Sequence, residues 1–127
     1  HLYQGRYKSF PVQSDEHFLS LCRYVERNAF TAELCEAPDQ WRFCSLYCWA
    51  HGSAAEKSIL SPWPIPRRPN WIKWVTQPLS DKEQKRLDWS IKRGAPFGDE
   101  TWVAETTQRC NLESTMRPTG RPKKLAR

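Results

Sequence analysis

The sequence has no long apolar run, no signal-peptide pattern and few hydrophobic residues. No stretch approaches the roughly 18 consecutive apolar residues that span a bilayer. Hydrophobic residues make up 39% of the 127, and the mean hydropathy is -0.79, so the core is expected to be modest. We therefore expect a cytoplasmic protein without membrane contact, built as one domain or as a domain core with a tail.

Cysteine is too scarce and too irregularly spaced to indicate a disulfide framework, so reduced thiols are expected. The five cysteines are Cys22, Cys35, Cys44, Cys48 and Cys110. A zinc site is an alternative, because three of them and His51 lie within seventeen residues. However, none of them forms the close C-x₂-C pair of structural zinc sites. Cys44 and Cys48 are also four apart in an expected helix, where small buried cysteines usually serve packing.

Acidic residues are missing from the last part of the chain. Ser114–Arg127 contains none, although the net charge of the chain is +6 and this segment holds Arg117, Arg121, Lys123, Lys124 and Arg127. The preceding 113 residues therefore carry only +1. A basic tail on a nearly neutral body favours a polyanionic partner such as nucleic acid. The alternative is a disordered terminus that only improves solubility.

The first sixty residues are expected to contain one short strand and then helices. Partial alternation of aromatic and β-branched residues predicts a strand over 5–12 that ends near Pro11. Ser14 is the predicted N-cap of a helix over 15–30. The stripe of this helix that should face the core contains Phe18, Cys22, Val25 and Ala29. Further helices are predicted over 40–50 and 54–60.

Prolines and tryptophans dominate the segment 61–79, which we interpret as a linker that packs on a surface, with one helical turn near 71–75. Ser80 and Glu83 form a capping-box pattern that predicts a helix ending at Arg93, before Gly94. Asp99 is the predicted N-cap of a last helix over 100–110. These two helices are expected to pack simply against the body, with a helix-turn-helix as the alternative.

Tyr24 and Asn28 are the residues that best suit a catalytic or metal-binding role. They are four apart on one predicted helix, so both side chains emerge from the same face. A phenol can act as a nucleophile where a divalent metal neutralises the developing phenolate. An amide oxygen one turn away can serve as a hard metal ligand. This spacing alone is common, and a tyrosine at a helix edge is more often structural.

Several blocks of the sequence closely resemble the REP-associated tyrosine transposases, a branch of the bacterial HUH single-strand transposases. The similarity extends over nearly the whole chain. The blocks are HLYQGRYKSF at 1–10, YVERNA at 24–29, WRFCSL at 41–46, NW at 70–71, RGAPFGDETWV at 93–103 and GRP at 120–122.

The resemblance implies a mechanism in which a helix-borne tyrosine attacks a phosphodiester of single-stranded DNA and leaves a 5′-phosphotyrosine link. By motif match Tyr24 is that nucleophile. The metal of the family, Mg²⁺ or Mn²⁺, is held by a His-hydrophobic-His pair and by a polar residue one turn after the tyrosine, which Asn28 matches. The implied partner is single-stranded or hairpin DNA from palindromic repeats.

The chain departs from the family because it contains no His-x-His. Its only histidines are His1, His17 and His51. In relatives the pair precedes the segment that begins this chain, so we expect a C-terminal part that is inactive alone. His17 lies about two turns before Tyr24 and is expected to be a surface or packing residue.

Basic residues outside the predicted helix over 15–30, which carries Tyr24, are candidates for DNA contacts. The resemblance suggests phosphate contacts for Arg6 and Lys8, which otherwise are solvated strand charges. Arg117, Arg121, Lys123 and Lys124 are expected to contact phosphates without sequence preference. The GRP core at 120–122 resembles an AT-hook, but Thr119 stands where such hooks carry arginine.

The expected architecture is α+β but mostly helical, a remnant of a ferredoxin-like HUH domain. Residues 1–60 would belong to the catalytic domain, 61–79 to the linker, 80–112 to a helical region and 113–127 to a disordered basic tail. Two other classes remain as alternatives: a non-catalytic DNA-binding module, and a small helical interaction protein with its tryptophans as the contact surface.

Overall fold

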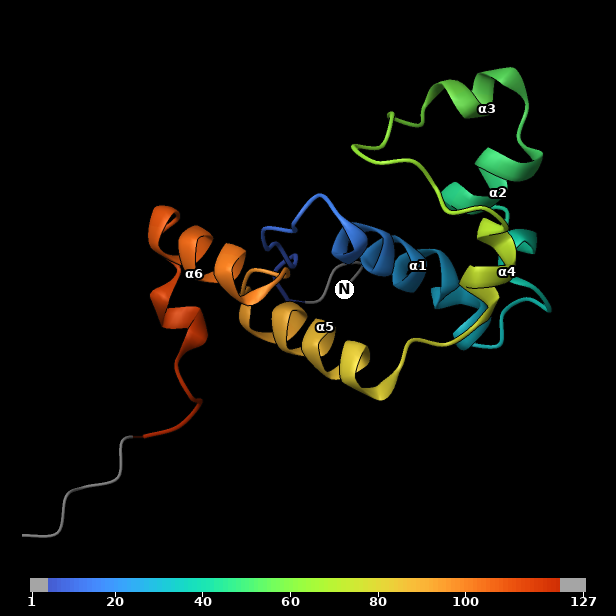
Figure 1. Ribbon diagram of the computed structural model, residues 1–127. Coiled ribbons are helices and arrows are strands. Elements are labelled where there is room, and N and C mark those ends of the chain that lie inside the picture. The colour runs from blue at the N-terminus through green and yellow to red at the C-terminus, as the bar shows by residue number, and fades with distance from the viewer. Residues whose placement is uncertain (1–4, 122–127) are drawn as a thin grey trace, which may run out of the picture.

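The computed structural model describes residues 5–121, which form a mostly helical molecule, as the sequence predicts. No helix in this part of the chain is long and apolar enough to cross a membrane. The helices are α1 Glu16–Thr31, η1 Pro38–Gln40, α2 Ser45–His51, α3 Ala54–Ser58, α4 Trp71–Thr76, α5 Asp81–Arg93, α6 Glu100–Arg109 and η2 Glu113–Met116. Figure 1 shows α2, α3 and α4 at one end of the molecule and α6 at the other, with α1 and α5 between them.

The strand predicted over 5–12 does not form within the described residues. Only Val12 pairs, in an isolated parallel bridge with Phe97. The backbone N–H of Gln13 donates to the Phe97 carbonyl, and the N–H of Phe97 donates to the Pro11 carbonyl, both at 2.9 Å. A strand needs a partner strand to satisfy its backbone groups, and residues 5–121 offer none. The α+β expectation therefore holds here only in its helical part.

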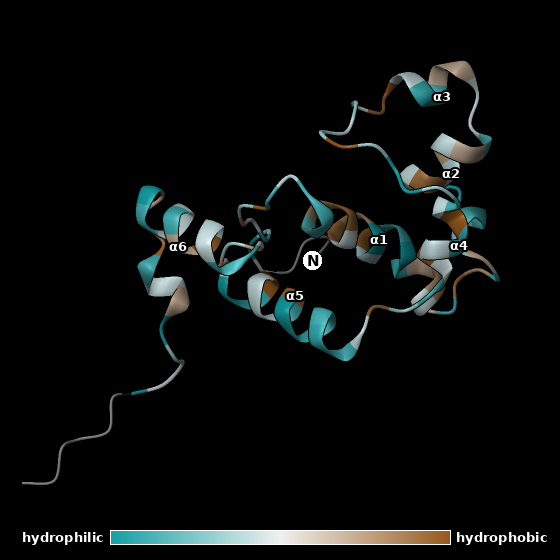
Figure 2. Ribbon diagram, viewed as in Figure 1, coloured by the Kyte–Doolittle hydropathy of each residue, from teal (hydrophilic) through white to brown (hydrophobic). Residues whose placement is uncertain are grey.

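The hydrophobic core lies where α1, α2, α4 and the linker meet. Its fully buried members are Leu19, Leu46, Trp71 and Val75. Tryptophans of the linker complete it, since the Trp63 ring packs edge-on against both Phe18 and Trp71. Figure 2 shows hydrophobic segments in α1 and α4, whereas α5 and α6 are largely hydrophilic. The linker is therefore part of the folded body, and it contains α4 at the predicted position.

The face that α1 buries differs from the predicted stripe. Phe18 and Cys22 pack against the core as predicted, but Val25 is 53% exposed. Arg23 and Glu26 are buried in its place, at 5% and 2% exposure. The helix is turned this way because both charged groups find hydrogen-bond partners inside, and burial is tolerable for a polar group only when it is so paired.

The starts of four helices test the sequence interpretation. The N-cap of α1 is Asp15 rather than Ser14, because the Asp15 carboxylate accepts the backbone N–H of His17 at 2.9 Å. The helix predicted from residue 40 begins only at Ser45, since Cys44 is extended and a separate 3₁₀ turn precedes it. Predictions for the later helices are confirmed: Ser80 and Glu83 form a capping box, and Asp99 caps α6.

Glycines allow the connection between α5 and α6. Gly94 ends α5 in the left-handed region, at φ +71°. Gly98 has no room for a side chain, because a Cβ atom there would lie 2.4 Å from the Trp102 ring. Residues 113–116, placed by the sequence in a disordered tail, form the 3₁₀ helix η2 instead. Arg93 stabilises this turn by donating hydrogen bonds to the carbonyls of Ser114 and Arg117.

Candidate functional site

Tyr24 and Asn28 lie together in a pocket of about 430 Å³. We call it the Tyr24 pocket; it is lined from α1 by Tyr24, Arg27, Asn28 and Thr31, and from the opposite side by Pro78, Leu79 and Gln84. Tyr24 is half-buried and Asn28 is exposed. The pocket therefore presents a phenol, an amide and a guanidinium on one helix face, open to solvent.

Arg23 fixes the far wall of the Tyr24 pocket. Its guanidinium donates two hydrogen bonds to the Gln77 carbonyl, at 3.0 and 2.9 Å, and one to the Pro78 carbonyl at 2.7 Å. It also stacks on Trp74, 4.3 Å from the ring centroid. Since Arg23 directly precedes Tyr24, these bonds hold the segment 77–79 beside the tyrosine. The sequence analysis predicted no role for Arg23. Its position directly before Tyr24 is the only feature of the sequence that could have indicated one.

Arg27 is the cation nearest in sequence to both Tyr24 and Asn28. It donates a hydrogen bond to the Thr31 hydroxyl at 2.9 Å and a longer one to the Thr76 carbonyl at 3.4 Å. Both are neutral acceptors, so the charge of Arg27 is not neutralised by a carboxylate among the described residues. A guanidinium held in this way can bind an anion such as phosphate that enters the pocket.

The Tyr24 pocket does not contain a complete metal site. Mg²⁺ and Mn²⁺ prefer several oxygen or imidazole ligands around one point. Asn28 is the only predicted ligand there, and neither a carboxylate nor a histidine lines the pocket. Nowhere between residues 5 and 121 do three His, Cys, Asp or Glu side chains converge as metal ligands. The residues present therefore do not fit the divalent metal that the sequence resemblance implies.

The histidines and cysteines have other contacts. His17 is hydrogen-bonded to the Asp15 carboxylate at 2.8 Å and packs edge-on against Phe97, away from the Tyr24 pocket. His51 is 2.8 Å from the Asp39 carboxylate, and the Cys44 thiol donates to the Trp41 carbonyl at 3.1 Å. Burial raises the pKa of the Cys22 thiol to about 12, so this thiol is a poor nucleophile.

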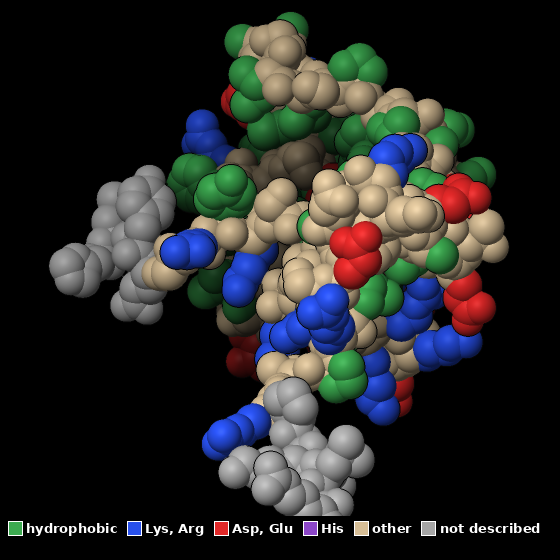
Figure 3. Space-filling view, turned by 90° about the vertical axis from the view of Figure 1, so that its left-hand side faces the viewer, with side chains coloured by type: hydrophobic (Ala, Val, Ile, Leu, Met, Phe, Trp, Pro, Cys, Tyr) green, Lys and Arg blue, Asp and Glu red, His purple; other side chains and the backbone are tan. Residues whose placement is uncertain are grey.

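The other predicted DNA contacts do not gather at the Tyr24 pocket. Arg6 and Lys8 are exposed, but neither lines it. Arg117 and Arg121 are exposed beyond α6, whereas Lys123 and Lys124 lie outside the described residues. Figure 3 shows Lys and Arg side chains over the lower part of one face, with few acidic side chains among them. This face has the charge that favours a polyanion.

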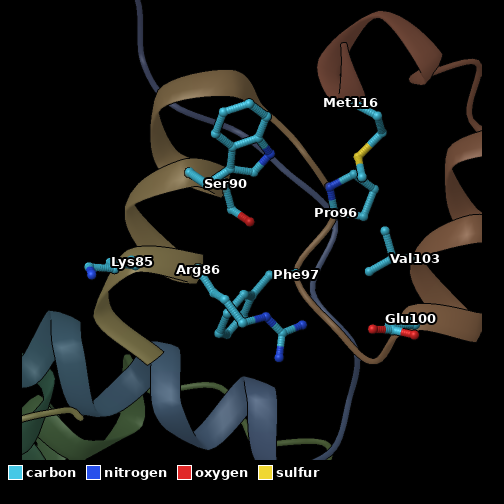
Figure 4. Close-up of a pocket in the computed structure, with 9 residues that line it drawn as sticks. Lys85, Arg86, Ser90, Pro96, Phe97, Glu100, Val103 and Met116 are labelled. Atoms are coloured by element: carbon cyan, nitrogen blue, oxygen red, sulfur yellow. The ribbon is translucent and has the colours of Figure 1, made fainter. Parts of the chain in front are cut away.

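A second pocket, of about 360 Å³, lies between α5 and α6. Trp89, Pro96, Phe97, Val103 and Met116 give it an apolar lining (Figure 4). Arg86 at its edge is held by a hydrogen bond to the Gly98 carbonyl. The exposed residues of α6 include Glu100 and Glu105, which would repel DNA phosphates. Simple packing of α6 therefore fits these observations better than a recognition helix.

Comparison of the chain with protein-family models, with curated proteins and with solved structures finds no match.

Proposed function

We propose that this chain is the tyrosine-bearing part of a single-strand DNA transposase of the REP-associated, HUH type. In this proposal residues 1–60 are the remnant of a ferredoxin-like catalytic domain. The observation that carries it is the Tyr24 pocket, in which the phenol of Tyr24, the amide of Asn28 and the guanidinium of Arg27 share one helix face. The motif resemblance of the sequence and the basic face support it.

The proposed reaction is attack of the Tyr24 oxygen on the phosphorus of a phosphodiester in single-stranded DNA. The phenol of Tyr24 loses its proton to solvent as the new O–P bond links Tyr24 to the 5′ side. The bond to the 3′ oxygen breaks, and this oxygen takes up a proton from solvent and leaves as a 3′-hydroxyl. Arg27 is suited to bind the charged phosphate oxygens beside the tyrosine. Arg23 serves as a positioning residue, since it holds the wall of the pocket.

The chain alone is expected to bind DNA without cleaving it. No His-x-His occurs in the sequence, and Asn28 is a single ligand where the family uses three. A non-catalytic DNA-binding module is therefore the second candidate function. The two candidates differ in one respect: only the first requires Tyr24 to become a nucleophile when a histidine pair is supplied.

The test is a chimera that joins the histidine-bearing half of a REP-associated tyrosine transposase to His1 of this chain. It is incubated with Mn²⁺ and a single-stranded hairpin with flanking strands, and covalent adducts are separated on a denaturing gel. We expect an adduct with the chimera, none with the isolated chain, and none with the Tyr24→Phe chimera. Tyr47→Phe, which alters a half-buried tyrosine of α2, is the matched control and should keep the adduct.

Two outcomes would refute the enzymatic proposal. An adduct that persists in the Tyr24→Phe chimera would assign the nucleophile to another residue. A chimera that is folded and binds the hairpin, yet forms no adduct while the parent transposase does, would leave the non-catalytic DNA-binding module as the function.

A further inference from the structure

A larger pocket, of about 790 Å³, is lined by residues of α2, of α4 and of the segment before α4. Figure 1 shows α2 and α4 at one end of the molecule. We call this cavity the Trp49 pocket, and the lining residues that matter here are Trp49, Arg67, Arg68, Asn70, Trp71 and Lys73. It shares no residue with the Tyr24 pocket. No acidic residue lines it. Its lining thus combines aromatic rings with three cationic side chains.

Arg67 is held against two indole rings rather than against a carboxylate. Its guanidinium carbon is 3.7 Å from the ring centroid of Trp63 and 4.5 Å from that of Trp49. Its Nε is buried and has no hydrogen-bond partner, and Arg67 takes part in no ion pair within residues 5–121. Stacking therefore fixes the orientation of a guanidinium that forms no direct ion pair, although the charge of Glu26 acts on it from within the core.

The other cations of the pocket differ in how they are paired. Arg68 forms an ion pair with Glu16 and stacks on Trp74, so its charge is already matched. Lys73 is exposed on α4 and belongs to none of the ion pairs that the described residues form. Arg67 and Lys73 are thus the two cations of the pocket that form no ion pair, and Lys73 is the more exposed of the two. A pair of cations in a pocket without carboxylates favours phosphate.

Trp49 offers a flat aromatic surface on which a base can stack. A free phosphate ion would not use such a surface. Trp49 is 37% exposed although it belongs to the indole cluster around Arg67. Asn70, at the rim, makes no side-chain hydrogen bond to cap α4. An exposed indole beside cationic side chains is the combination on which unpaired bases stack while their phosphates are bound. A duplex keeps its bases stacked inside and cannot present them to such a ring.

We propose that the Trp49 pocket binds one nucleotide of a single-stranded nucleic acid, with the phosphate at Arg67 and Lys73 and the base stacked on Trp49. This site is additional to the Tyr24 pocket and requires no cleavage. It would retain a flanking single strand whether or not Tyr24 reacts.

The experiment measures binding of the full 127-residue chain to fluorescein-labelled oligothymidylate by anisotropy, with a duplex of equal length and heparin as competitors. Trp49→Leu is compared with Trp89→Leu, because these tryptophans are similarly exposed, at 37% and 39%. Lys73→Gln is compared with Lys57→Gln, which removes an exposed lysine from α3. Circular dichroism and thermal melts confirm that each variant is folded.

We expect Trp49→Leu and Lys73→Gln each to weaken oligothymidylate binding by about 5- to 50-fold, as stacking and charge-assisted contacts do. The two control variants should bind within about twofold of the unaltered chain. Equal losses in all four variants, or no loss in the first two, would overturn the proposal. The proposal would also be overturned if heparin or the duplex bound with the same affinity as oligothymidylate and Trp49→Leu did not weaken that binding. None of these variants alters a residue of the Tyr24 pocket, so this test and the adduct test of the proposed function can fail independently.

Discussion

Glu26 is an acidic residue of α1, the helix that carries Tyr24, and its side chain is buried in the core. Its carboxylate accepts hydrogen bonds from the Trp71 indole at 2.7 Å and from the Ser45 hydroxyl at 2.9 Å. Burial raises the pKa of Glu26, and these two hydrogen bonds and the charge of Arg67 oppose that rise without cancelling it. The carboxylate therefore links α1, α2 and α4 at the cost of burying a charge.

The raised pKa of Glu26 makes stability depend on pH in a definite direction. The folded protein holds the Glu26 proton more tightly than the unfolded chain, so this residue lowers the free energy of unfolding as pH rises above the ordinary value of 4.5. Glu26→Gln removes the titration. We expect the stability of this variant relative to the unaltered chain to rise as the pH increases above 4.5, measured by urea unfolding at a series of pH values.

The matched control for this residue is Glu105→Gln, which alters an exposed glutamate of α6. It removes one negative charge from an exposed side chain, so its stability relative to the unaltered chain over the same range measures the general effect of losing that charge. A constant difference for Glu26→Gln would show that Glu26 titrates alike in the folded and unfolded chain.

Among the helices, α5 has the clearest sequence-encoded start. The Ser80 hydroxyl accepts the backbone N–H of Glu83 at 3.3 Å, and the Glu83 carboxylate accepts the backbone N–H of Ser80 at 3.0 Å. Partial burial would raise the pKa of Glu83, but its hydrogen bonds from Ser80 and the charge of Arg23 lower it. The same turn thus orders α5 and forms the far side of the Tyr24 pocket through Gln84.

Ser80→Ala is expected to lower the free energy of unfolding by about 1 kcal/mol, as loss of an N-cap usually does. Ser53→Ala is the comparison, since Ser53 caps α3 in the same manner. Its effect should be smaller because α3 buries no side chain and can fray without disturbing the core. Urea denaturation of both variants measures the difference, and an equal cost at the two caps would contradict this explanation.

Sequence patterns correctly predicted the helix boundaries that depend only on residues close in sequence. The caps at Ser80 and Asp99, the stop at Gly94 and the turn of α4 need only neighbours a few residues away. The shared face of Tyr24 and Asn28 follows likewise from the helical period. Long-range contacts decided the rest, and they leave no local pattern.

Arg23 and Val25 show why the buried face of α1 could not be predicted. Hydrophobicity favours Val25 inside, whereas Arg23 becomes acceptable there only because carbonyls of Gln77 and Pro78 lie 54 and 55 residues away to receive its hydrogen bonds. The missing strand has a similar cause, because a strand depends on a partner and not on its own sequence. The Trp49 pocket was also missed, although the density of tryptophans in the linker indicated a packed surface.

At the scale of the whole molecule, α1 makes contacts to both the Tyr24 pocket and the Trp49 pocket. Arg23 connects α1 to the segment beside Tyr24, while Glu26, three residues later, connects α1 to Trp71 of the Trp49 pocket. The tyrosine helix therefore positions both pockets through buried polar contacts. Under the two proposals, a single strand that binds at Trp49 and reacts at Tyr24 would contact residues that this one helix positions.

The basic C-terminal segment adds positive charge to the molecule, and those of its basic residues that the structure describes line none of the pockets discussed above. Arg121, Lys123, Lys124 and Arg127 carry four of the six net charges. If they contact phosphates, their removal lowers the dependence of binding on salt, because each phosphate contact releases a counterion. A chain that ends after Gly120 keeps the Arg117 carbonyl that Arg93 binds, so η2 should remain intact.

For this shortened chain we expect the slope of log affinity against log salt on single-stranded DNA to fall by about 3, from four contacts at about 0.7 each. A chain whose last seven residues are rearranged, with the same composition but without Gly-Arg-Pro, should bind like the original on duplexes of any sequence. Loss of binding confined to A·T-rich duplexes in the rearranged chain would instead indicate minor-groove recognition by the segment around Arg121. An unchanged salt slope in the shortened chain would show that these charges do not touch the DNA.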